Sequence, residues 1–456
     1  MTLQRYALLL LAAFLFYGCT TVRRARQAQT ATSRHPGEIT VTAAQAGLEP
    51  YGRYALTNFE AVACAYHPAL FQARQAVESA RLQCRMTRSS RLPQITASGA
   101  YNRSTQNAWG RSASSEMRGS WSGALGLDLL LFDFGKLDTQ ERQALEALVA
   151  AEEQLRETEI DVIYTVRAAF FEHHRSDELV RVSIESAQQY AQHLEEARVM
   201  VEVGTRRQYD VTKAEVDLGN ARLEIITASN ALVTARAQFN RALGLAEGTA
   251  FGIGEGAMPP HPESVDALMA AARVNAPALA VLRARERAAS AYVDQTIAEL
   301  YPDLSLGADA DLSGRGFPLA WNFSWGLRLV QNLFDGHRKT ARIDESVTQL
   351  RAARSHVADA EQALYKDLVD AVAQRESARK RLELSELVQR QTEENLAIVN
   401  EQYRVGISSS IERTDAQVAV TQARADVVRA RYDTQAALAR IARLIGEAKG
   451  EGREAD

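Results

Sequence analysis

The sequence predicts an α+β membrane protein made of a duplicated unit, in which four transmembrane β-strands are joined to very long, coiled-coil-like α-helices. Three observations carry this prediction. The same order of motifs occurs twice along the chain. Two long segments without proline place apolar residues at seven-residue spacing. Shorter segments alternate apolar and polar residues, and they contain all four tryptophans.

The composition excludes several other classes of protein. The 456 residues are 46% hydrophobic and 24% charged, with a formal net charge of −4. A disordered chain would have fewer apolar residues and a larger net charge, and a general nucleic-acid binder would carry a basic surplus. Three cysteines are too few for a protein whose fold is stabilised mainly by disulfides at this length. A polytopic helical membrane protein needs several apolar runs of roughly 20 residues, and only the N-terminus comes close.

Residues 1–18 are predicted to be an export signal. Arg5 gives a basic start, and the apolar core that follows is too short for a comfortable transmembrane helix. A small residue and Cys19 close this core, which resembles a bacterial lipoprotein signal. We therefore expect cleavage before a lipidated Cys19, with 19–55 as the first segment of the mature chain; plain cleavage nearby is the alternative. Thr20 favours the outer membrane as destination, by analogy with lipoproteins.

The chain is an internal duplication. The matching positions are Pro68 and Pro277, Pro93 and Pro302, Phe132 and Phe334, Gly204 and Gly406, and Gly244 and Gly446. The first two pairs differ by 209 positions, as in 277 − 68, and the other three differ by 202, as in 406 − 204. The second copy has therefore lost seven residues between Pro302 and Phe334. We expect the repeats at 56–246 and 276–446.

A linker is expected at 247–275, and a short tail at 447–456. The first part of the linker is dense in glycine and proline, which marks irregular structure. Gly252, Gly254 and Gly256 superficially resemble a phosphate-binding loop, but no strand precedes them and no capped helix follows in the right frame. No nucleotide site is predicted here.

Helices are expected at the start and over the last part of each repeat. The first helix covers Pro68–Ser90 or Pro277–Leu300, and a following proline ends it. Long helical segments then cover about 136–244 and about 337–446, each divided by a glycine turn. In the first of these, Leu148, Leu155, Val162 and Ala169 step by seven, which predicts helices packed side by side. An ordinary coiled-coil stalk has the same periodicity.

Two alternating segments lie in each repeat, at about 94–133 and about 303–334. From Trp321 to Leu329 every second residue is apolar. This fits a strand between lipid and water, for which about ten residues suffice, although a half-buried soluble sheet alternates in the same way. The export signal favours the membrane, as do the tryptophans, because indole rings prefer membrane interfaces. The tryptophans are Trp109, Trp121, Trp321 and Trp325.

Four strands cannot close a barrel alone. Open strand edges are not tolerated in lipid, and about eight strands make the smallest closed barrel. The strands must therefore be pooled in a symmetric oligomer. Two chains would supply eight strands and three would supply twelve, and only the larger barrel leaves a useful bore.

The duplicated motifs resemble the TolC family of outer-membrane efflux and secretion channels. The matching stretches are Arg91-Leu92-Pro93, Leu-Phe-Asp-Phe-Gly at 131–135, Leu-Phe-Asp-Gly at 333–336 and Tyr403-Arg404-Val405-Gly406-Ile407-Ser408. The resemblance covers about 55–446. It implies a homotrimer with a twelve-stranded barrel in the outer-membrane lipid of a Gram-negative bacterium, continued by a twelve-helix tunnel across the periplasm. It also implies the exit duct of a tripartite efflux or type I secretion system.

The resemblance implies partners and places them at the two helix-to-helix turns. A periplasmic adaptor protein would bind these turns, and an inner-membrane pump would supply the energy. The implied contact residues are Val203, Gly204, Thr205, Val405, Gly406 and Ile407. Glycine suits such turns because they need positive φ.

The resemblance also implies a narrow aperture lined by acids. Glu412 and Asp415 lie six and nine residues after the second turn glycine, and Asp210 matches Glu412 in the first repeat. Three copies would form carboxylate rings that attract cations. Acids also favour the first turn of any helix, which is the plainer interpretation. Candidate polar links that hold the tip closed are Arg206, Arg207 and Tyr209.

The sequence predicts no catalytic site, cofactor or metal site. His173 and His174 are adjacent and so face different directions on a helix, and we expect them at the surface. No nucleophile-elbow pattern occurs. Cys64 and Cys84 lie in alanine-rich helical sequence, where buried thiols are favoured over a disulfide. The alternative to a channel is a periplasm-spanning structural coiled-coil lipoprotein without a pore.

Overall fold

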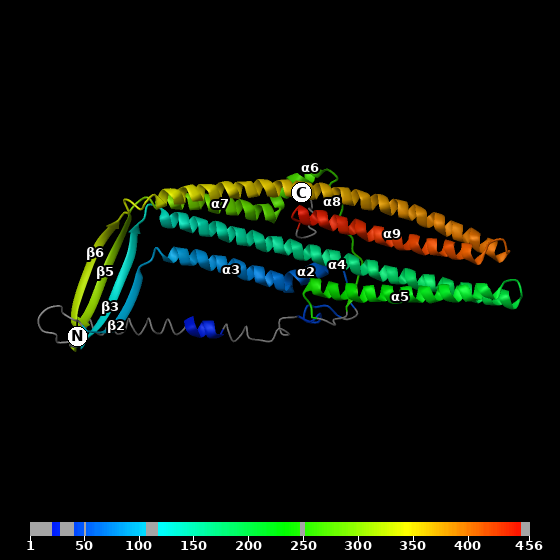
Figure 1. Ribbon diagram of the computed structural model, residues 1–456, viewed down its shortest axis with the longest axis horizontal. Coiled ribbons are helices and arrows are strands. Elements are labelled where there is room, and N and C mark those ends of the chain that lie inside the picture. The colour runs from blue at the N-terminus through cyan, green and yellow to red at the C-terminus, as the bar shows by residue number, and fades with distance from the viewer. Residues whose placement is uncertain (1–20, 28–40, 50–51, 106–116, 247–250, 448–456) are drawn as a thin grey trace.

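The computed structural model describes residues 21–27, 41–49, 52–105, 117–246 and 251–447. The molecule is elongated, with a β-sheet at one end and two helical hairpins at the other (Figure 1). Its main helices are α2 (Leu56–Tyr66), α3 (Pro68–Ser89), α4 (Lys136–Glu202), α5 (Gln208–Leu243), α6 (Val265–Asn275), α7 (Pro277–Ala298), α8 (Arg338–Arg404) and α9 (Ser410–Leu444). Its strands are β1 (Arg53–Tyr54), β2 (Gln94–Thr105), β3 (Met117–Phe132), β4 (Gly252–Ile253), β5 (Asp303–Gly314) and β6 (Ala320–Val330).

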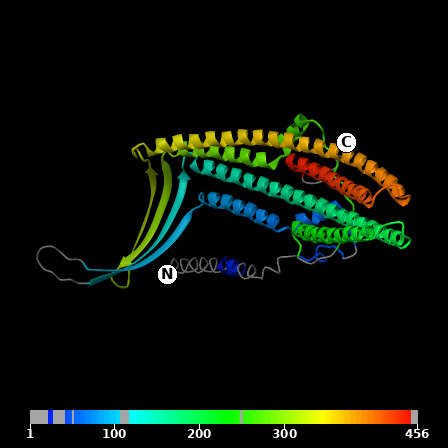
Figure 2. The ribbon, with the colours of Figure 1, turned by 45° about the vertical axis from the view of Figure 1, so that its right-hand side comes forward.

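The predicted fold class is confirmed in the order and length of these elements. Helices α4 and α8 each have 67 residues, which corresponds to about 100 Å at roughly 1.5 Å per residue. They run from the sheet to the hairpin tips, and α5 and α9 return from the tips to the middle of the molecule (Figure 2). The first helix of each repeat ends one or two residues earlier than predicted, at Ser89 and Ala298.

The four long strands form one antiparallel sheet in the order β2-β3-β5-β6. The middle pairing joins the two repeats, since Leu127 of β3 lies opposite Ala308 of β5. On either side, Ile95 pairs with Leu127 and Ala308 pairs with Trp325. Such rows put the apolar residues of all four strands on one face, as the alternation predicts.

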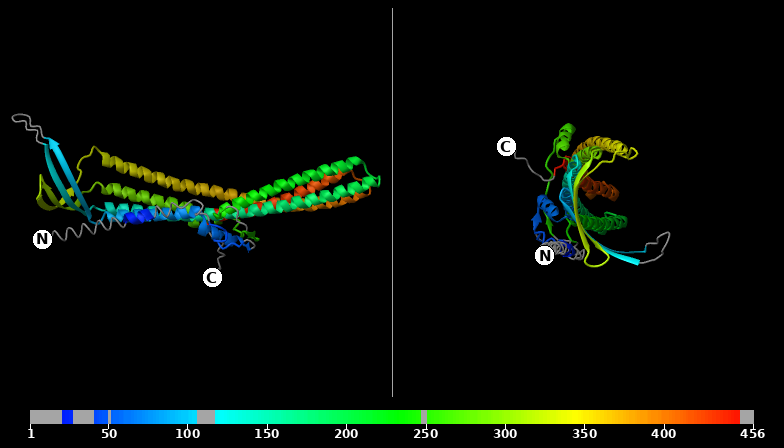
Figure 3. Two further views of the ribbon diagram at one scale, coloured as in Figure 1. Left: turned by 90° about the horizontal axis from the view of Figure 1, so that it is seen from below. Right: turned by 90° about the vertical axis from the view of Figure 1, so that its left-hand side faces the viewer.

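This apolar face is exposed in the single chain. Trp121, Trp321 and Trp325 are all exposed on it, whereas Trp109 lies outside the described residues. Viewed from its end, the sheet is a curved arc rather than a ring (Figure 3). Among the described residues, β2 and β6 are its two edges.

The aspartate of the repeated Leu-Phe-Asp motif lies three residues before the start of each long helix. Asp133 accepts hydrogen bonds from the amides of Gly135 and Leu137, at 3.1 and 2.6 Å. Asp335 does the same for the amides of Arg338 and Lys339. A carboxylate here satisfies amides that have no partner within the helix and complements the positive end of the helix dipole. The motif therefore fixes where the strand ends and the helix starts.

The end of α5 lies against the start of α3, and the end of α9 lies against the start of α7. Gly244 ends α5 with φ 72°, and a Cβ there would lie 3.0 Å from the Cα of His67, next to the start of α3. Gly446 repeats this at the junction of α9 and α7, where a Cβ would lie 2.4 Å from the carbonyl oxygen of Asn275. Both positions therefore require glycine for conformation and for space.

The densest packing lies near the middle of the molecule. Phe59, Phe170 and Phe239 are fully buried there, and the Arg167 guanidinium pairs with Glu60 at 2.6 Å in the same region. The predicted linker segment passes over this core and includes β4 and α6.

His173 and His174, expected at the surface, are both half-buried. His174 Nε2 lies 2.9 Å from the carbonyl oxygen of Gly254 in the linker, and the His173 ring packs beside Phe239. Burial, with a smaller contribution from Arg236, lowers the pKa of His173 to about 4. The contact of the linker with His174 is not revealed by the sequence pattern.

Cys64 and Cys84 are not joined to each other. Cys84 is buried and its thiol donates to the carbonyl oxygen of Ala144, while Cys64 is half-buried. The preference for thiols over a disulfide is therefore confirmed.

Among the described helices, none is by itself long and apolar enough to cross a membrane, although α6 and α7 together, bent by 50°, meet the requirements of length and composition.

Candidate functional site at the two hairpin tips

The outermost residues of the two turns that end the hairpins are exposed. Gly204 and Gly406 have φ values of 80° and 82°, as predicted from the glycines. The apolar residues beside them are exposed, with Val203 at 72%, Val405 at 69% and Ile407 at 77%. Thr205 is exposed as well. Apolar side chains held outward on a tight turn are suited to contact with another protein.

Arg206 connects the first tip to the second. Its guanidinium donates to the carbonyl oxygens of Tyr403 and Ser408, at 2.9 and 3.1 Å. It also lies over the Tyr403 ring, 4.3 Å from the centroid. These carbonyls belong to the end of α8 and the second turn, where helix C-terminal oxygens have no helical partner and attract cations.

Arg413 approaches the same tyrosine from α9. It is only 7% exposed, lies 4.7 Å from the Tyr403 centroid, and donates to Glu196 of α4 at 2.6 Å and to Asn400 of α8 at 2.9 Å. Burial raises the pKa of Tyr403. Both cations contact the buried Tyr403 ring, and Arg413 joins the second hairpin to the first through Glu196.

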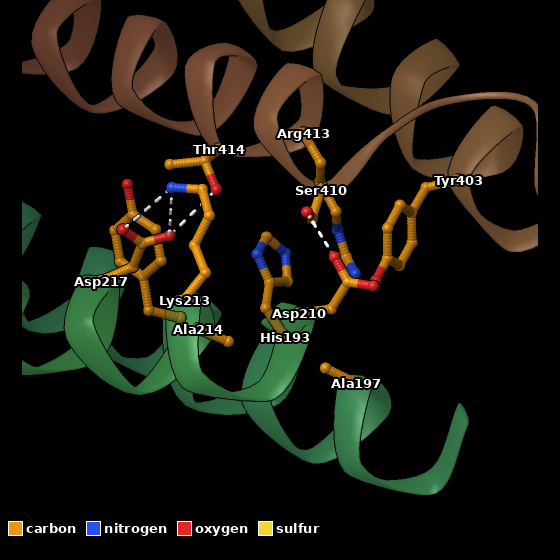
Figure 4. A pocket seen from close by; sticks show the side chains of 11 residues that line it. His193, Ala197, Asp210, Lys213, Ala214, Asp217, Tyr403, Ser410, Arg413 and Thr414 are labelled. Carbon is orange, nitrogen blue, oxygen red and sulfur yellow. Dashed lines mark hydrogen bonds and ion pairs between the residues drawn. The ribbon is translucent and has the colours of Figure 1, made fainter. Parts of the chain in front are cut away.

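Further polar contacts join α5 to α9. The Ser410 hydroxyl donates to Asp210 at 2.6 Å, and the Thr414 hydroxyl donates to Asp217 at 3.0 Å. Lys213 pairs with Asp217 at 3.3 Å. Figure 4 shows these side chains facing one another from the two hairpins.

A small cavity of about 20 Å³ lies between these contacts, which is room for one water molecule. His193 lines it, and burial, followed by repulsion from Arg413, lowers the pKa of His193 to about 4. Burial, followed by the negative charge of Asp217, raises the pKa of Tyr190 to about 12. Both groups are therefore neutral at pH 7.

Comparison with known proteins places this geometry in a family. The family model described as "Outer membrane efflux protein" matches residues 62–245 and 268–447, which is most of the chain. The chain belongs to the outer membrane efflux protein family. The match falls on both repeats, in agreement with the predicted TolC-family resemblance.

Individual relatives agree with this assignment. The chain is 23% identical over 356 residues to the probable efflux pump outer membrane protein TtgC of Pseudomonas putida, covering 75% of this chain and 72% of the relative. It is 24% identical over 402 residues to the outer membrane protein OprJ of Pseudomonas aeruginosa, covering 83% and 81%. The crystal structure of the Vibrio cholerae outer membrane protein VceC superimposes with a TM-score of 0.73 at 15% identity, covering 86% and 96%.

As a member of this family, the protein is an outer-membrane exit duct for efflux and not an enzyme. None of these matches supports the alternative of a structural lipoprotein without a pore.

The predicted site residues of this efflux protein divide into two groups. Arg206 and Asp210 are brought together with the second hairpin by the contacts above. Glu412 and Asp415 are exposed, and the Glu412 carboxylate accepts from the Ser409 amide at 3.0 Å in a capping box. The plainer interpretation of Glu412, an acid that starts a helix, therefore describes one of its contacts.

Arg207 and Tyr209 are exposed, and neither side chain bridges the two hairpins of this chain within the described residues. Cys19 lies outside the described residues.

Sequence reasoning missed Tyr403, Arg413, Ser410 and His193. One signal for Arg413 was available, because its counterpart in the first repeat, 202 positions earlier, is the apolar residue Val211. An arginine in place of a core residue indicates a buried cation with a specific partner. Comparison of the two repeats could therefore have found it.

Proposed function

We propose that three copies of this chain form the exit duct. Their strands would close into a twelve-stranded barrel in the outer membrane, and their long helices would continue it as a tunnel into the periplasm. The observation that carries this proposal is the open sheet with edges β2 and β6 and an exposed apolar face. Lipid does not tolerate open edges, four strands are too few to close, and a symmetric ring of copies satisfies both requirements.

The tips are proposed to bind a periplasmic adaptor protein, which links the duct to an inner-membrane pump. The exposed apolar side chains at both turns support this assignment, because they lie at the end of the molecule farthest from the sheet. The proposed contact residues are Val203, Gly204, Thr205, Val405, Gly406 and Ile407. Energy comes from the pump, as the duct itself has no nucleotide motif.

An acidic aperture is proposed just beyond the second turn. Glu412 and Asp415 are one turn apart on the exposed side of α9, so three copies would present two carboxylate rings. Asp210 is placed with them, although its carboxylate also accepts from Ser410. We propose Arg206 as the link that keeps the two hairpins of one chain together, and Arg207 and Tyr209 as residues available to a neighbouring chain.

The outer-membrane chain is proposed to carry a lipid anchor at Cys19. The support is the sequence pattern of a lipoprotein signal, with a cysteine that closes the apolar core. Metabolic labelling with a palmitate analogue should label the chain, and Cys19→Ser should remove the label. Labelling that persists in this variant would contradict the anchor.

The decisive experiment for the duct combines extraction with mass measurement. The protein should resist high-salt and alkaline washing of outer membranes, dissolve in detergent, and have the native mass of a trimer. Reconstituted in a planar bilayer, it should conduct ions. Release by an alkaline wash without detergent, or a monomer in detergent, would overturn the proposal.

A further inference from the structure

A larger cavity lies next to the small one, farther from the two turns. It has a volume of about 320 Å³ and is bounded by α4, α5 and α9. Tyr190, Asp217 and Thr414 line both cavities, and Figure 4 shows Asp217 and Thr414 facing each other. This volume lies in the lower range of small-molecule sites and far exceeds the space that one water molecule needs.

We propose that this cavity is a cargo-contact site for a protonated organic amine, with Glu224 and Asp217 as its anionic groups. The inference rests on the proposed duct and names a chemical class of cargo for its wall. Ala221 and Val418 also line the cavity and offer apolar contact to the hydrocarbon part of such a molecule. A bare metal ion would leave most of this volume unfilled.

The cavity opens on the side of the proposed acidic aperture. Its lining residues Asn220, Glu224, Val418 and Gln422 are exposed. On α9, Val418 and Gln422 follow Asp415 by three and seven positions, and such spacings lie on one face of a helix. The cavity is therefore on the tunnel side of the proposed duct, about 10 Å beyond the aperture along α9. Cargo that has passed the aperture reaches the cavity next.

The hydroxyl groups of the cavity have already used their protons. Ser183 and Thr421 each donate to the carbonyl oxygen four residues earlier, at 2.9 and 3.0 Å. Because Thr421 donates there, Ser186 must be the donor in the 3.1 Å contact between the Ser186 and Thr421 hydroxyls. Thr414 donates to Asp217 at 3.0 Å. What these four hydroxyls can still offer a ligand is acceptor lone pairs.

The charged groups of the cavity are also acceptors. Among the described residues that line it, none is basic, and two are carboxylates. Asp217 is partly neutralised by Lys213, at 3.3 Å from the neighbouring small cavity. Glu224 has no ionic or hydrogen-bond partner among the residues that the structure describes. Its negative charge is therefore available to a ligand.

Few donors remain to balance these acceptors. The Gln422 side-chain amide donates to Asp426 at 3.0 Å, which leaves its oxygen free. Among the described lining residues, Tyr190 and Asn220 keep a side-chain donor. A primary ammonium group has three N–H donors and no acceptor, so it is complementary to this lining. An anionic ligand would instead meet two carboxylates.

Binding of benzylammonium to the detergent-solubilised native protein tests the site. Saturation-transfer NMR should show saturable binding. Two matched probes should bind about tenfold more weakly or worse, because hydrogen bonds between charged groups contribute strongly. Benzyltrimethylammonium keeps the charge and lacks the N–H donors, and benzyl alcohol lacks the charge. Benzyl alcohol that binds as tightly as benzylammonium would overturn the assignment to amines.

Four variants locate the binding. Glu224→Gln should weaken benzylammonium binding about tenfold, and Val418→Trp, which fills the cavity, should weaken it as well. The control Glu215→Gln removes the same charge from α5 at a residue that pairs with Arg198 and does not line the cavity, so it should bind as wild type. Glu412→Gln combined with Asp415→Asn should also keep the binding, because these acids lie at the aperture and not in the cavity.

The outcomes separate the cavity from the duct. The inference is overturned if the wild type shows no saturable binding, if Glu224→Gln binds as tightly as wild type, or if only the aperture variant loses binding. In each case a trimeric native mass and ion conductance would leave the proposed duct standing. A monomer without conductance would overturn the duct itself, and with it the role of the cavity in the passage of cargo.

Discussion

The two hairpin tips have the same backbone and different side chains. In each, the glycine has a φ close to 80°, and the amide one residue after it donates to the carbonyl oxygen four residues before it, at 2.9 Å in both. At the positions around this turn the repeats diverge. Arg206 corresponds to Ser408, Val211 to Arg413 and His193 to Asn395.

Because of this difference, the two turns supply different groups to the contact between the hairpins. The first tip supplies the Arg206 donors, and the second supplies the carbonyl oxygens of Tyr403 and Ser408 that accept them. Backbone carbonyls are present at both tips, so the direction of this contact is set by the arginine, which only the first tip carries. The two turns share a backbone because each needs a residue with positive φ, and their different side chains let the first hairpin bind the second.

The largest expected effect is a loss of stability of the first hairpin at acidic pH. Burial lowers the pKa of His193 from 6.5 to about 4, so between these values the unfolded segment takes up a proton that the folded segment does not. The contribution of neutral His193 to stability is therefore complete above pH 6.5 and is lost as the pH falls toward 4, by at most about 3 kcal/mol. Hydrogen exchange should show protection of tip amides in α4 and α5 falling more than in α8 and α9.

The matched control replaces His193 with the residue found at the equivalent position of the second repeat. His193→Asn introduces the residue found at position 395, which does not titrate. The variant should lose most of the pH dependence at the tip, while acid sensitivity near His173 in the middle of the molecule remains, because the pKa of His173 is also about 4. Tip protection that still falls with acid in this variant would exclude His193 as the cause.

The second prediction removes the arginine donor of the first tip. Arg206→Ala removes two charge-assisted hydrogen bonds between the hairpins, a loss of roughly 2 kcal/mol. If this contact holds the tips together in the closed duct, the open state should gain by about thirty-fold, seen as higher conductance in planar bilayers. Arg207→Ala, an exposed neighbour that makes no bridge to the second hairpin, should behave as wild type. Equal conductance in the two variants would remove Arg206 from closure.

The sequence predicts the scaffold of this site better than its contacts. Gly204 and Gly406 locate both turns because positive φ strongly favours glycine. Arg206 could be named as a link, but its acceptors are backbone carbonyls, which exist at every position and leave no pattern. Arg413 looks like an exposed residue at a helix start, and only the packing of α4 against α9 buries it beside Glu196.

The third prediction tests the shared backbone. Gly204→Ala and Gly406→Ala force alanine into a left-handed conformation at sites where nothing crowds the new Cβ, so each should cost about 1 kcal/mol. Because the two turns have the same geometry, the two losses should be equal in chemical unfolding or local exchange. Gly219→Ala, within α5 and equally uncrowded, should be neutral or stabilising. Clearly unequal losses at the two tips would mean that the turns are not equivalent.

The smallest effect on stability, and the sharpest on selectivity, is expected from the acids of the second tip. Glu412→Gln with Asp415→Asn removes both charges, and glutamine can keep the helix cap that Glu412 makes with Ser409. Stability should change by less than about 0.5 kcal/mol, while reversal potentials in salt gradients should show a weaker preference for cations. Asp415→Lys copies Lys213 from the first tip, changes the charge of each chain by the same two units, and should weaken the preference to a similar extent. If selectivity is the same in all three proteins, these acids do not line the aperture, and the divergence of the two tips serves only the contact between hairpins.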